Sequence, residues 1–321
     1  MGDGVRADRT IRREGGSVRA GVDRLLAGHR SGRVAARWGA VRGRAVALLW
    51  HRIRPEGPYA HEAVRAVASD TFAAQLDVLG EIGDVVPLSD LEESRRSARP
   101  RFALTFDDDD VGHVEYTLPI LQERQLTATF FLSGRWREAR GPYWWELLER
   151  RVRDDGLAVV AAAYGHPEAS DVSSLAAALT GTDEARQLAA TTGAVGSESM
   201  SGVQARVLAA AGMEIGFHTL DHPSLPTLPD QQLMAAVSDG RDELADELRT
   251  TITRFAYPHG HVDERVSDAV RTGDYRSAWT TSKRTVTRGE DRMRLGRWDL
   301  SRLDATAFRL ALVRGLARPG P

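Results

Sequence analysis

Acidic and histidine side chains occur in two short clusters whose composition suits metal-dependent hydrolysis. The apolar segment 101–106 runs directly into four consecutive carboxylates at 107–110. A second cluster, 216–223, follows another apolar run and places His218 and His222 four positions apart. Two His at this spacing lie on one face of a helical turn and can bind one cation. Two imidazoles and one carboxylate leave a position open for water, and a neighbouring carboxylate can then accept a proton from that water.

The position of the acids separates this interpretation from a simpler one. Four adjacent carboxylates repel one another, and an exposed acidic loop is the ordinary explanation of such a run. Here the acids stand at the end of a predicted buried strand, where a cation would hold them together. We therefore interpret 107–110 and 216–223 as two parts of one metal site.

A third segment, 254–260, reads Arg-Phe-Ala-Tyr-Pro-His-Gly and follows the apolar run 251–253. Its Tyr-Pro-His-Gly end is a turn by composition. The turn could be a plain connection between a strand and a helix. In a hydrolase it would direct a backbone N–H at the oxyanion of a tetrahedral intermediate.

The elements that must position these residues alternate in type along the chain. Short apolar runs alternate with longer segments of helical period, which predicts βα units around a parallel sheet and a distorted (β/α) barrel of α/β class. In such barrels reactive groups lie where strands end. We expect strands at 46–51, 84–87, 102–106, 127–132, 213–218, 252–257, 275–280 and 294–299. We expect helices near 70–82, 113–125, 143–153, 201–211, 229–248, 262–272 and 304–316.

Two regions stand apart from this pattern. Residues 1–44 contain eleven Arg against four acidic residues, which predicts a basic N-terminal arm before a barrel domain at 45–321. The arm could make a weak contact with anionic surfaces, but a solvated leader is the better interpretation. Residues 154–200 are rich in Ala, Ser, Thr and Gly with weak period, and we expect them to form an insertion, with a mobile cap as one interpretation.

Composition excludes several classes of protein. The net charge of −2 argues against nucleic acid as a partner, and the absence of cysteine limits metal ligands to His and carboxylate. The longest early apolar run, 45–50, is too short for a transmembrane segment, and no apolar core of a signal peptide is visible near the N-terminus. We therefore expect a cytoplasmic location.

Taken in chain order, the three motifs resemble the polysaccharide deacetylase (NodB-homology) family, whose motifs read roughly TFDDG, H(S/T)xxH and RxPYG. The likeness spans about 46–300 and includes the segments 49–53 and 128–131. It implies that Asp107 is the catalytic base and that Asp108 is a metal ligand. It also implies that both histidines of the 216–223 motif are ligands.

The chain departs from the family pattern at three points. Asp109 replaces the usual Gly, which could turn the loop differently or add a carboxylate near the metal. Ala256 stands where many members have an Arg that orients the base. No His follows His261, so the late catalytic His of the family is missing.

Four histidines are candidates for the acid that protonates the leaving amine, because imidazole donates near neutral pH. We prefer His51, which stands at a strand end, and also assign His259 to the catalytic group. His261 lies near a helix start, where capping or solvent exposure is the simpler interpretation. His113 could bind the loop or the metal instead.

Substrate contacts are assigned to Tyr257, Pro258 and Trp145. Trp144 is adjacent to Trp145, and neighbours on a helix point in different directions, so at most one of the two is expected to stack on a sugar. The cofactor is one divalent ion, with zinc first and cobalt, nickel or manganese also compatible.

The resemblance therefore implies a metal-dependent hydrolase that removes an N-acetyl group from an aminosugar-containing glycan, glycoside or precursor. A small glycoside, nucleotide sugar or lipid-linked precursor suits the expected location better than a wall polymer. Two alternatives remain: an amide hydrolase acting on a small nitrogenous metabolite, and a catalytically silent carbohydrate-binding relative.

Overall fold

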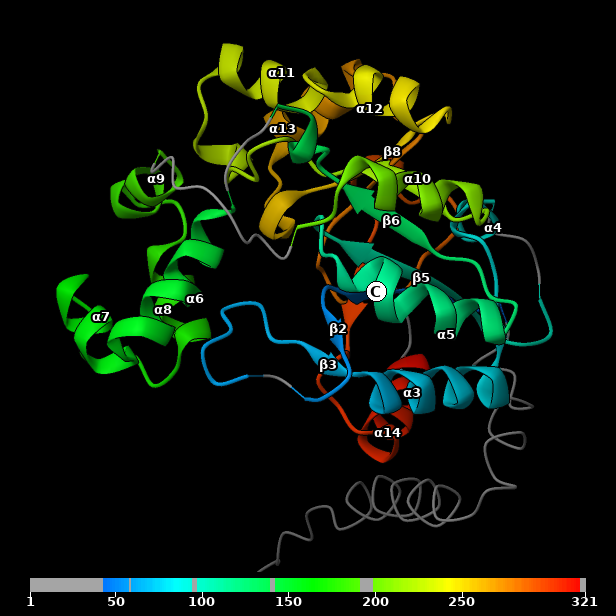
Figure 1. Ribbon diagram of the computed structural model, residues 1–321. Helices are drawn as coiled ribbons and strands as arrows, with labels where there is room; N and C mark the ends of the chain where they lie inside the picture. The colour runs from blue at the N-terminus through cyan, green and yellow to red at the C-terminus, as the bar shows by residue number, and fades with distance from the viewer. Residues whose placement is uncertain (1–42, 58, 94–96, 139–141, 191–198, 318–321) are drawn as a thin grey trace, which may run out of the picture.

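A ring of parallel strands forms the centre of the molecule (Figure 1). The computed structural model describes residues 43–57, 59–93, 97–138, 142–190 and 199–317. The predicted basic arm at 1–44 therefore lies outside the described residues except for its last two. The main sheet consists of β1 (Ala45–Trp50), β4 (Asp84–Val85), β5 (Arg101–Asp107), β6 (Thr129–Leu132), β7 (Glu214–Phe217), β8 (Arg254–Ala256), β9 (Ser277–Trp279) and β10 (Arg297–Asp299).

The strand order makes this sheet a nearly closed barrel. Neighbours follow the order β10-β1-β5-β6-β7-β8-β9, every pairing is parallel, and β4 lies beside β5. Leu295, just before β10, forms a parallel bridge with Trp279 of β9 and so brings the two ends of the sheet together. The predicted distorted (β/α) barrel is confirmed.

Alternate side chains along the strands belong to two different hydrophobic clusters. Ala45, Ala47, Ala103 and Ala256 belong to a small cluster with Phe131 and Trp279, whereas the residues between them on β1 and β5 join the large cluster beneath the helices. Successive side chains on a strand point to opposite faces, so the small cluster fills the barrel interior. Its alanines leave space for larger polar side chains from other strands.

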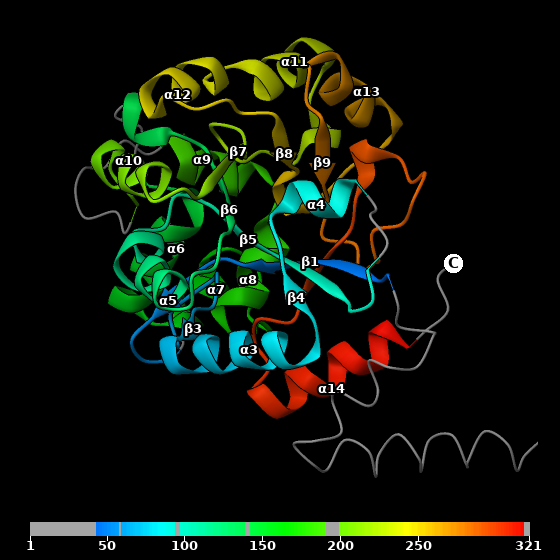
Figure 2. The same ribbon diagram turned by 90° about the vertical axis from the view of Figure 1, so that its right-hand side faces the viewer.

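Helices cover the outside of the barrel in two groups (Figures 1 and 2). Helices α3 and α14 lie together on one side, and α11, α12 and α13 lie on the opposite side, with α5 and α10 between the two groups. None of the helices among the described residues is long and apolar enough to cross a membrane. The bounds are α3 (Ser69–Ile82), α4 (Leu88–Glu92), α5 (Leu118–Glu123), α10 (Gly202–Ala210), α11 (Asp230–Ser238), α12 (Arg241–Leu248), α13 (Glu264–Thr272) and α14 (Ala305–Leu316).

Most predicted elements are present, with one helix divided. The segment expected to be a single helix at 229–248 forms α11 and α12, which meet at Gly240. Gly240 has a φ of 86°, a left-handed conformation that glycine adopts without a steric penalty and that a continuous helix cannot contain.

A separate helical unit stands beside the barrel, visible in green at the left of Figure 1. It contains α6 (Trp144–Asp155), α7 (Leu157–Ala163), α8 (Val172–Leu179) and α9 (Asp183–Ala190). These helices share a hydrophobic cluster distinct from that of the barrel. The segment 154–200, expected to form an insertion, contributes α7, α8 and α9 to this unit. Their short length and high alanine content hide the helical period in the sequence.

Candidate active site

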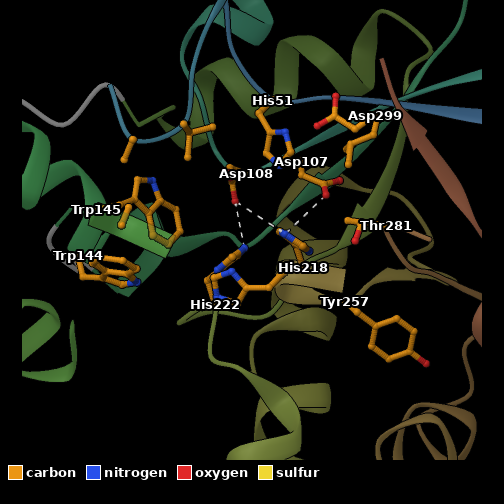
Figure 3. A pocket seen from close by; sticks show the side chains of 15 residues that line it. His51, Asp107, Asp108, Trp144, Trp145, His218, His222, Tyr257, Thr281 and Asp299 are labelled. Atoms are coloured by element: carbon orange, nitrogen blue, oxygen red, sulfur yellow. Dashed lines mark ion pairs between the residues drawn. The ribbon is translucent and has the colours of Figure 1, made fainter. Parts of the chain in front are cut away.

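Three strand ends deliver polar side chains to one point of the barrel rim (Figure 3). Asp107 is the last residue of β5 and is followed by Asp108, while His218 follows β7. His51 follows β1, and His222 belongs to the loop after β7. These side chains line one cavity of about 340 Å³. Parallel strands end at the same rim, so residues far apart in the sequence meet there.

Asp108, His218 and His222 have the geometry of a three-ligand metal site. One ligand atom from each lies within 4.8 Å of the others. Asp108 Oδ1 is 3.8 Å from His218 Nε2 and 3.7 Å from His222 Nε2. Tetrahedral zinc with bonds of about 2 Å requires ligand atoms roughly 3.4 Å apart, so only a small closure is needed.

Two further observations fit a cation at this point. Asp108 Oδ1 is buried and has no hydrogen-bond partner among the described residues, although a buried carboxylate oxygen normally has one. His218 Nδ1 lies 2.8 Å from the carbonyl oxygen of Ala256, to which it can donate a hydrogen bond. That bond leaves the Nε2 lone pair facing Asp108, which is the usual arrangement around a metal-bound imidazole.

The pKa shifts of Asp108 and His222 in the absence of a cation also favour a metal ion at this point. Burial, and then the charge of Asp107, raise the pKa of Asp108 well above its usual range. Burial, followed by the charges of His259 and His218, lowers the pKa of His222 well below its usual range. A divalent cation reverses the cost of the carboxylate charge and binds neutral imidazole, so the cluster is better suited to a metal than to solvent.

Asp107 forms a buried ion pair with Arg297 of β10. The guanidinium donates to both carboxylate oxygens, at 2.6 and 2.7 Å, and the Arg297 side chain is fully buried. Arg297 also donates to Thr105 Oγ1 at 3.3 Å and to the Thr280 carbonyl at 3.2 Å. Burial raises the pKa of Asp107, but the charge and hydrogen bonds of Arg297, with His218, outweigh it and lower the pKa to about 2. Asp107 is therefore a carboxylate at neutral pH.

The next two acids of the run point away from the proposed metal position. Asp109 accepts hydrogen bonds from the backbone N–H of Ser133 at 2.8 Å and of Arg135 at 3.2 Å. Asp110 accepts two hydrogen bonds from Arg54, at 2.6 and 2.8 Å. These bonds explain how Asp107, Asp109 and Asp110 coexist as neighbouring carboxylates, because each of the three has separate partners.

Backbone strain is concentrated at this rim. Among the described residues, seven non-glycine residues have positive φ, and four of them are Asp108 (71°), Thr219 (62°), His222 (52°) and His259 (58°). Such conformations are costly for residues with a Cβ and persist mainly at functional sites. A π-helical turn, His113–Thr117, also lies next to the acidic loop.

The polysaccharide deacetylase family model matches residues 94–197 and 184–278, which together span more than half of the chain. The chain belongs to the polysaccharide deacetylase family. The confirmed resemblance places it among deacetylases that act on carbohydrates. No curated protein shows significant sequence similarity to it.

Solved structures of family members share the fold. The Streptococcus pyogenes deacetylase PplD, solved with acetate, is 16% identical, with a TM-score of 0.59, and the match covers 86% of this chain and 99% of that one. IcaB from Ammonifex degensii is 20% identical, with a TM-score of 0.57 and coverage of 86% and 97%. A de-N-acetylase from Aggregatibacter actinomycetemcomitans is 14% identical, with a TM-score of 0.56 and coverage of 81% and 96%. At these identities the likeness concerns the fold.

Arg297 corrects one expectation about how this deacetylase departs from its family. The resemblance implies that Ala256 replaces an Arg that orients the base, but Asp107 does not lack a cationic partner, because β10 supplies one. Sequence reasoning missed Arg297. Its signal was an Arg inside a predicted strand at 294–299, at a position that faces the barrel interior and therefore requires a buried counter-charge.

The candidate histidines separate into three groups. His51 and His259 line the cavity, and the His259 ring lies 4.5 Å from that of His222. His113 lies beneath the acidic loop instead, with Nε2 at 3.2 and 3.1 Å from the carbonyl oxygens of Asp107 and Asp108. His261 is exposed and contacts Ser224 through Nδ1 at 3.1 Å. Of the four, only His51 and His259 face the space where a substrate would bind.

Burial lowers the pKa of both cavity histidines. For His51 the charges of Asp107 and then Asp299 oppose this effect. For His259 the charges of His261 and His218 add to it and bring the pKa to about 4. His51 therefore has the more favourable surroundings for a protonated imidazole.

The residues assigned to substrate binding lie at different depths. Tyr257 is fully buried, its hydroxyl donates to the Met293 carbonyl at 2.7 Å, and its ring points away from the cavity centre in Figure 3. Pro258 is buried at the start of a 3₁₀ turn, Pro258–Gly260. Trp145 lines the cavity and meets the His222 ring edge-on at 4.8 Å. Trp144 lines the cavity as well, and the expectation that at most one of the two tryptophans stacks on a sugar stays a prediction.

Proposed function

We propose that this family member is a metal-dependent N-deacetylase that releases acetate from an acetylated aminosugar. The observation that carries the proposal is the buried Asp108, His218 and His222 cluster, with its unpartnered carboxylate oxygen, next to Asp107. A silent binding protein needs no ionised carboxylate beside a metal site. The Asp107–Arg297 pair therefore favours an enzyme over the silent alternative.

A divalent ion held by these three residues would supply Lewis-acid activation of water and of the amide carbonyl. Zinc suits two imidazoles and a carboxylate, and cobalt, nickel or manganese are also compatible. The other steps belong to the residues of this chain.

Asp107 is placed to accept a proton from the attacking water. Its Oδ2 lies 3.8 Å from His218 Nε2, so a water activated by an ion that this cluster would hold lies within its reach. Arg297 holds both carboxylate oxygens and so fixes the orientation of the base. Such pre-organisation lowers the barrier because the base does not need to move during the reaction.

His51 is the proposed acid for the leaving amine. It lines the cavity near Asp107, and Asp299 also favours its charged form. Proton transfer from His51 to nitrogen accompanies cleavage of the C–N bond, so water and the amide yield acetate and a free amine.

The 254–260 loop is proposed to stabilise the oxyanion through its backbone. The Tyr257 N–H already donates to the Trp279 carbonyl at 3.0 Å, and Pro258 has no N–H. The next donor in the loop is the N–H of His259, whose φ of 58° turns it out of regular structure. Gly260, with a φ of 71°, packs its backbone against Thr281, where a side chain would collide. The loop is therefore firmly positioned against β9.

The test is a screen for acetate release by metal-loaded protein. Acetylated aminosugars, their glycosides and small N-acyl metabolites are incubated separately, and products are identified by mass spectrometry. Release from sugars supports the proposal; release only from small nitrogenous amides supports the amide hydrolase alternative. Sugar binding without release by fully metal-loaded protein would support the silent relative. The cytoplasmic location stays a prediction from the sequence.

A further inference from the structure

The cavity has two chemically different sides (Figure 3). One side carries the metal cluster together with His51, Thr281 and Asp299. The other side, which we call the apolar wall, is made by Ala63, Val64, Trp144, Trp145 and Ala176. In Figure 3, Trp144 and Trp145 stand across the cavity from Thr281 and Asp299.

The apolar wall comes from outside the barrel. Trp144 and Trp145 begin α6, and Ala176 lies on α8. Ala63 and Val64 belong to a loop that follows β2 (Ile53–Arg54), a strand that forms a separate two-stranded sheet with β3 (Val67–Ala68). All five residues pack in the hydrophobic cluster of the helical unit. The loop and the helices therefore form one body that faces the metal site.

A buried carboxylate on α6 joins the two parts of the apolar wall, the loop and the helices, through hydrogen bonds. Glu149, one turn after Trp145 on α6, accepts hydrogen bonds from the backbone N–H of Ala63 at 2.7 Å and of Val64 at 3.3 Å. Arg52 donates to both oxygens of Glu149, at 2.8 and 3.0 Å. Such a fully bonded buried network fixes one arrangement of the segments that it joins.

The same arginine connects the wall to the catalytic loop. Arg52 follows His51 directly, and its Nε lies 3.4 Å from Asp110, two residues after Asp108. The distance between the apolar wall and the proposed metal position is thus set by buried ion pairs. The apolar wall is therefore held in a fixed position relative to the catalytic loop.

The chemistry of the wall restricts what can lie against it. Sugar hydroxyls lose hydrogen bonds to water on binding and need protein partners in exchange. The side chains of Ala63, Val64 and Ala176 offer none, whereas the opposite side offers Asp299, Thr281 and His51. A sugar ring with its hydroxyls toward Asp299 leaves its other substituent beside the wall.

We propose that the substrate is an acetylated aminosugar glycoside whose aglycone is an alkyl or prenyl chain, and that the apolar wall binds this chain. The inference rests on the proposed deacetylase function and adds the class of the aglycone. A further sugar unit in the same place can stack one face on a tryptophan, but its hydroxyls would lie against Ala63, Val64 and Ala176, whose side chains offer no hydrogen-bond partner. The proposal therefore predicts a preference for apolar glycosides over oligosaccharides.

A homologous series on the metal-loaded, unmodified protein tests the proposal. The methyl, butyl and octyl β-glycosides of N-acetylglucosamine are compared with the N-acetylglucosamine trisaccharide by kcat/KM for acetate release. We expect kcat/KM to rise by up to about fourfold per methylene group that reaches the wall, because burial of one CH₂ contributes ~0.8 kcal/mol. The rise should stop when the chain extends beyond the wall.

The outcomes separate this proposal from the proposed function. Acetate release at equal kcat/KM across the series, or faster release from the trisaccharide, would overturn the apolar-aglycone proposal and leave the deacetylase intact. No release from any acetylated sugar would instead refute the deacetylase function on which it rests.

A matched pair of variants locates the effect. Ala176→Asp places a charge on the wall and should reduce the octyl-to-methyl ratio of kcat/KM at least tenfold. Ala177→Asp makes the same change at the next, exposed position of α8 and should leave that ratio unchanged. Equal ratios in the two variants, with both folded by circular dichroism, would contradict the assignment of the wall.

Discussion

Replacing Asp107 by Asn tests both the catalytic assignment and the buried ion pair. The substitution keeps the shape of the side chain, but it removes the negative charge that faces Arg297 at 2.6 and 2.7 Å. It also removes the proposed proton acceptor. Asp108, the proposed ligand, is untouched, so the metal should stay bound.

The expected loss of activity is large and falls on turnover. General-base catalysis typically contributes about 10²- to 10⁴-fold, and loss of an interaction made in the transition state lowers kcat more than it raises KM. Wild-type and Asp107→Asn proteins are compared in kcat and KM at equal metal content, measured by plasma emission. A variant within a few-fold of wild-type turnover, with metal bound, would show that Asp107 is not the base.

The expected loss of stability follows from the burial of Arg297. A pKa of about 2 for Asp107, against an ordinary value of 3.8, corresponds to about 2 kcal/mol in favour of the paired carboxylate. Leaving a buried charge without its partner typically costs about 3–5 kcal/mol. We therefore expect Asp107→Asn to lower the free energy of unfolding, measured in urea, by between about 2 and 5 kcal/mol.

Two controls distinguish the ion pair from a general effect of the substitution. Asp84 pairs with Arg99 at 2.7 Å on the surface, both side chains being 45% exposed, so Asp84→Asn should cost no more than about 1 kcal/mol. The double variant Asp107→Asn with Arg297→Met removes both buried charges and should recover much of the stability without recovering turnover. A double variant that is less stable than the single one would refute the reasoning from an uncompensated charge.

Four other outcomes are expected. His222→Ala should lose most bound metal and activity together, and full occupancy by plasma emission would reject the ligand assignment. Because the pKa of Asp107 is lowered from 3.8 to about 2, its stabilising contribution should be complete above about pH 5 and be lost as the pH falls through 2; the free energy of unfolding measured against pH should show this loss in wild type and not in Asp107→Asn. Tyr143→Phe removes the 2.8 Å hydrogen bond that the Tyr143 hydroxyl donates to Ser133, directly before Trp144 of the apolar wall. This loss should raise KM more than it lowers kcat, whereas an unchanged KM would show that the hydrogen bond does not help to position the wall. Deletion of residues 1–40 should leave folding and turnover of a soluble substrate intact; loss of either would place the arm in the catalytic domain.

The sequence alone determined the barrel and the ends of its strands. Both faces of the parallel strands are covered, so their sequences are short continuous apolar runs that local inspection detects. Reactive residues follow these runs directly, and Asp107, Asp108 and His218 could therefore be assigned to one rim. Neighbouring residues in the sequence carried all of this information.

Tertiary structure alone decided which distant residues meet at that rim. Arg297 pairs with Asp107 across 190 positions, because β10 and β5 both flank β1 and turn the same face inward. Trp145 reaches His222 because the helical unit packs beside the barrel rim. Local sequence patterns specify periodicity and strand ends, but strand order and the packing of separate units depend on contacts between remote segments. The partner of the base and the apolar wall therefore became visible only in the folded chain.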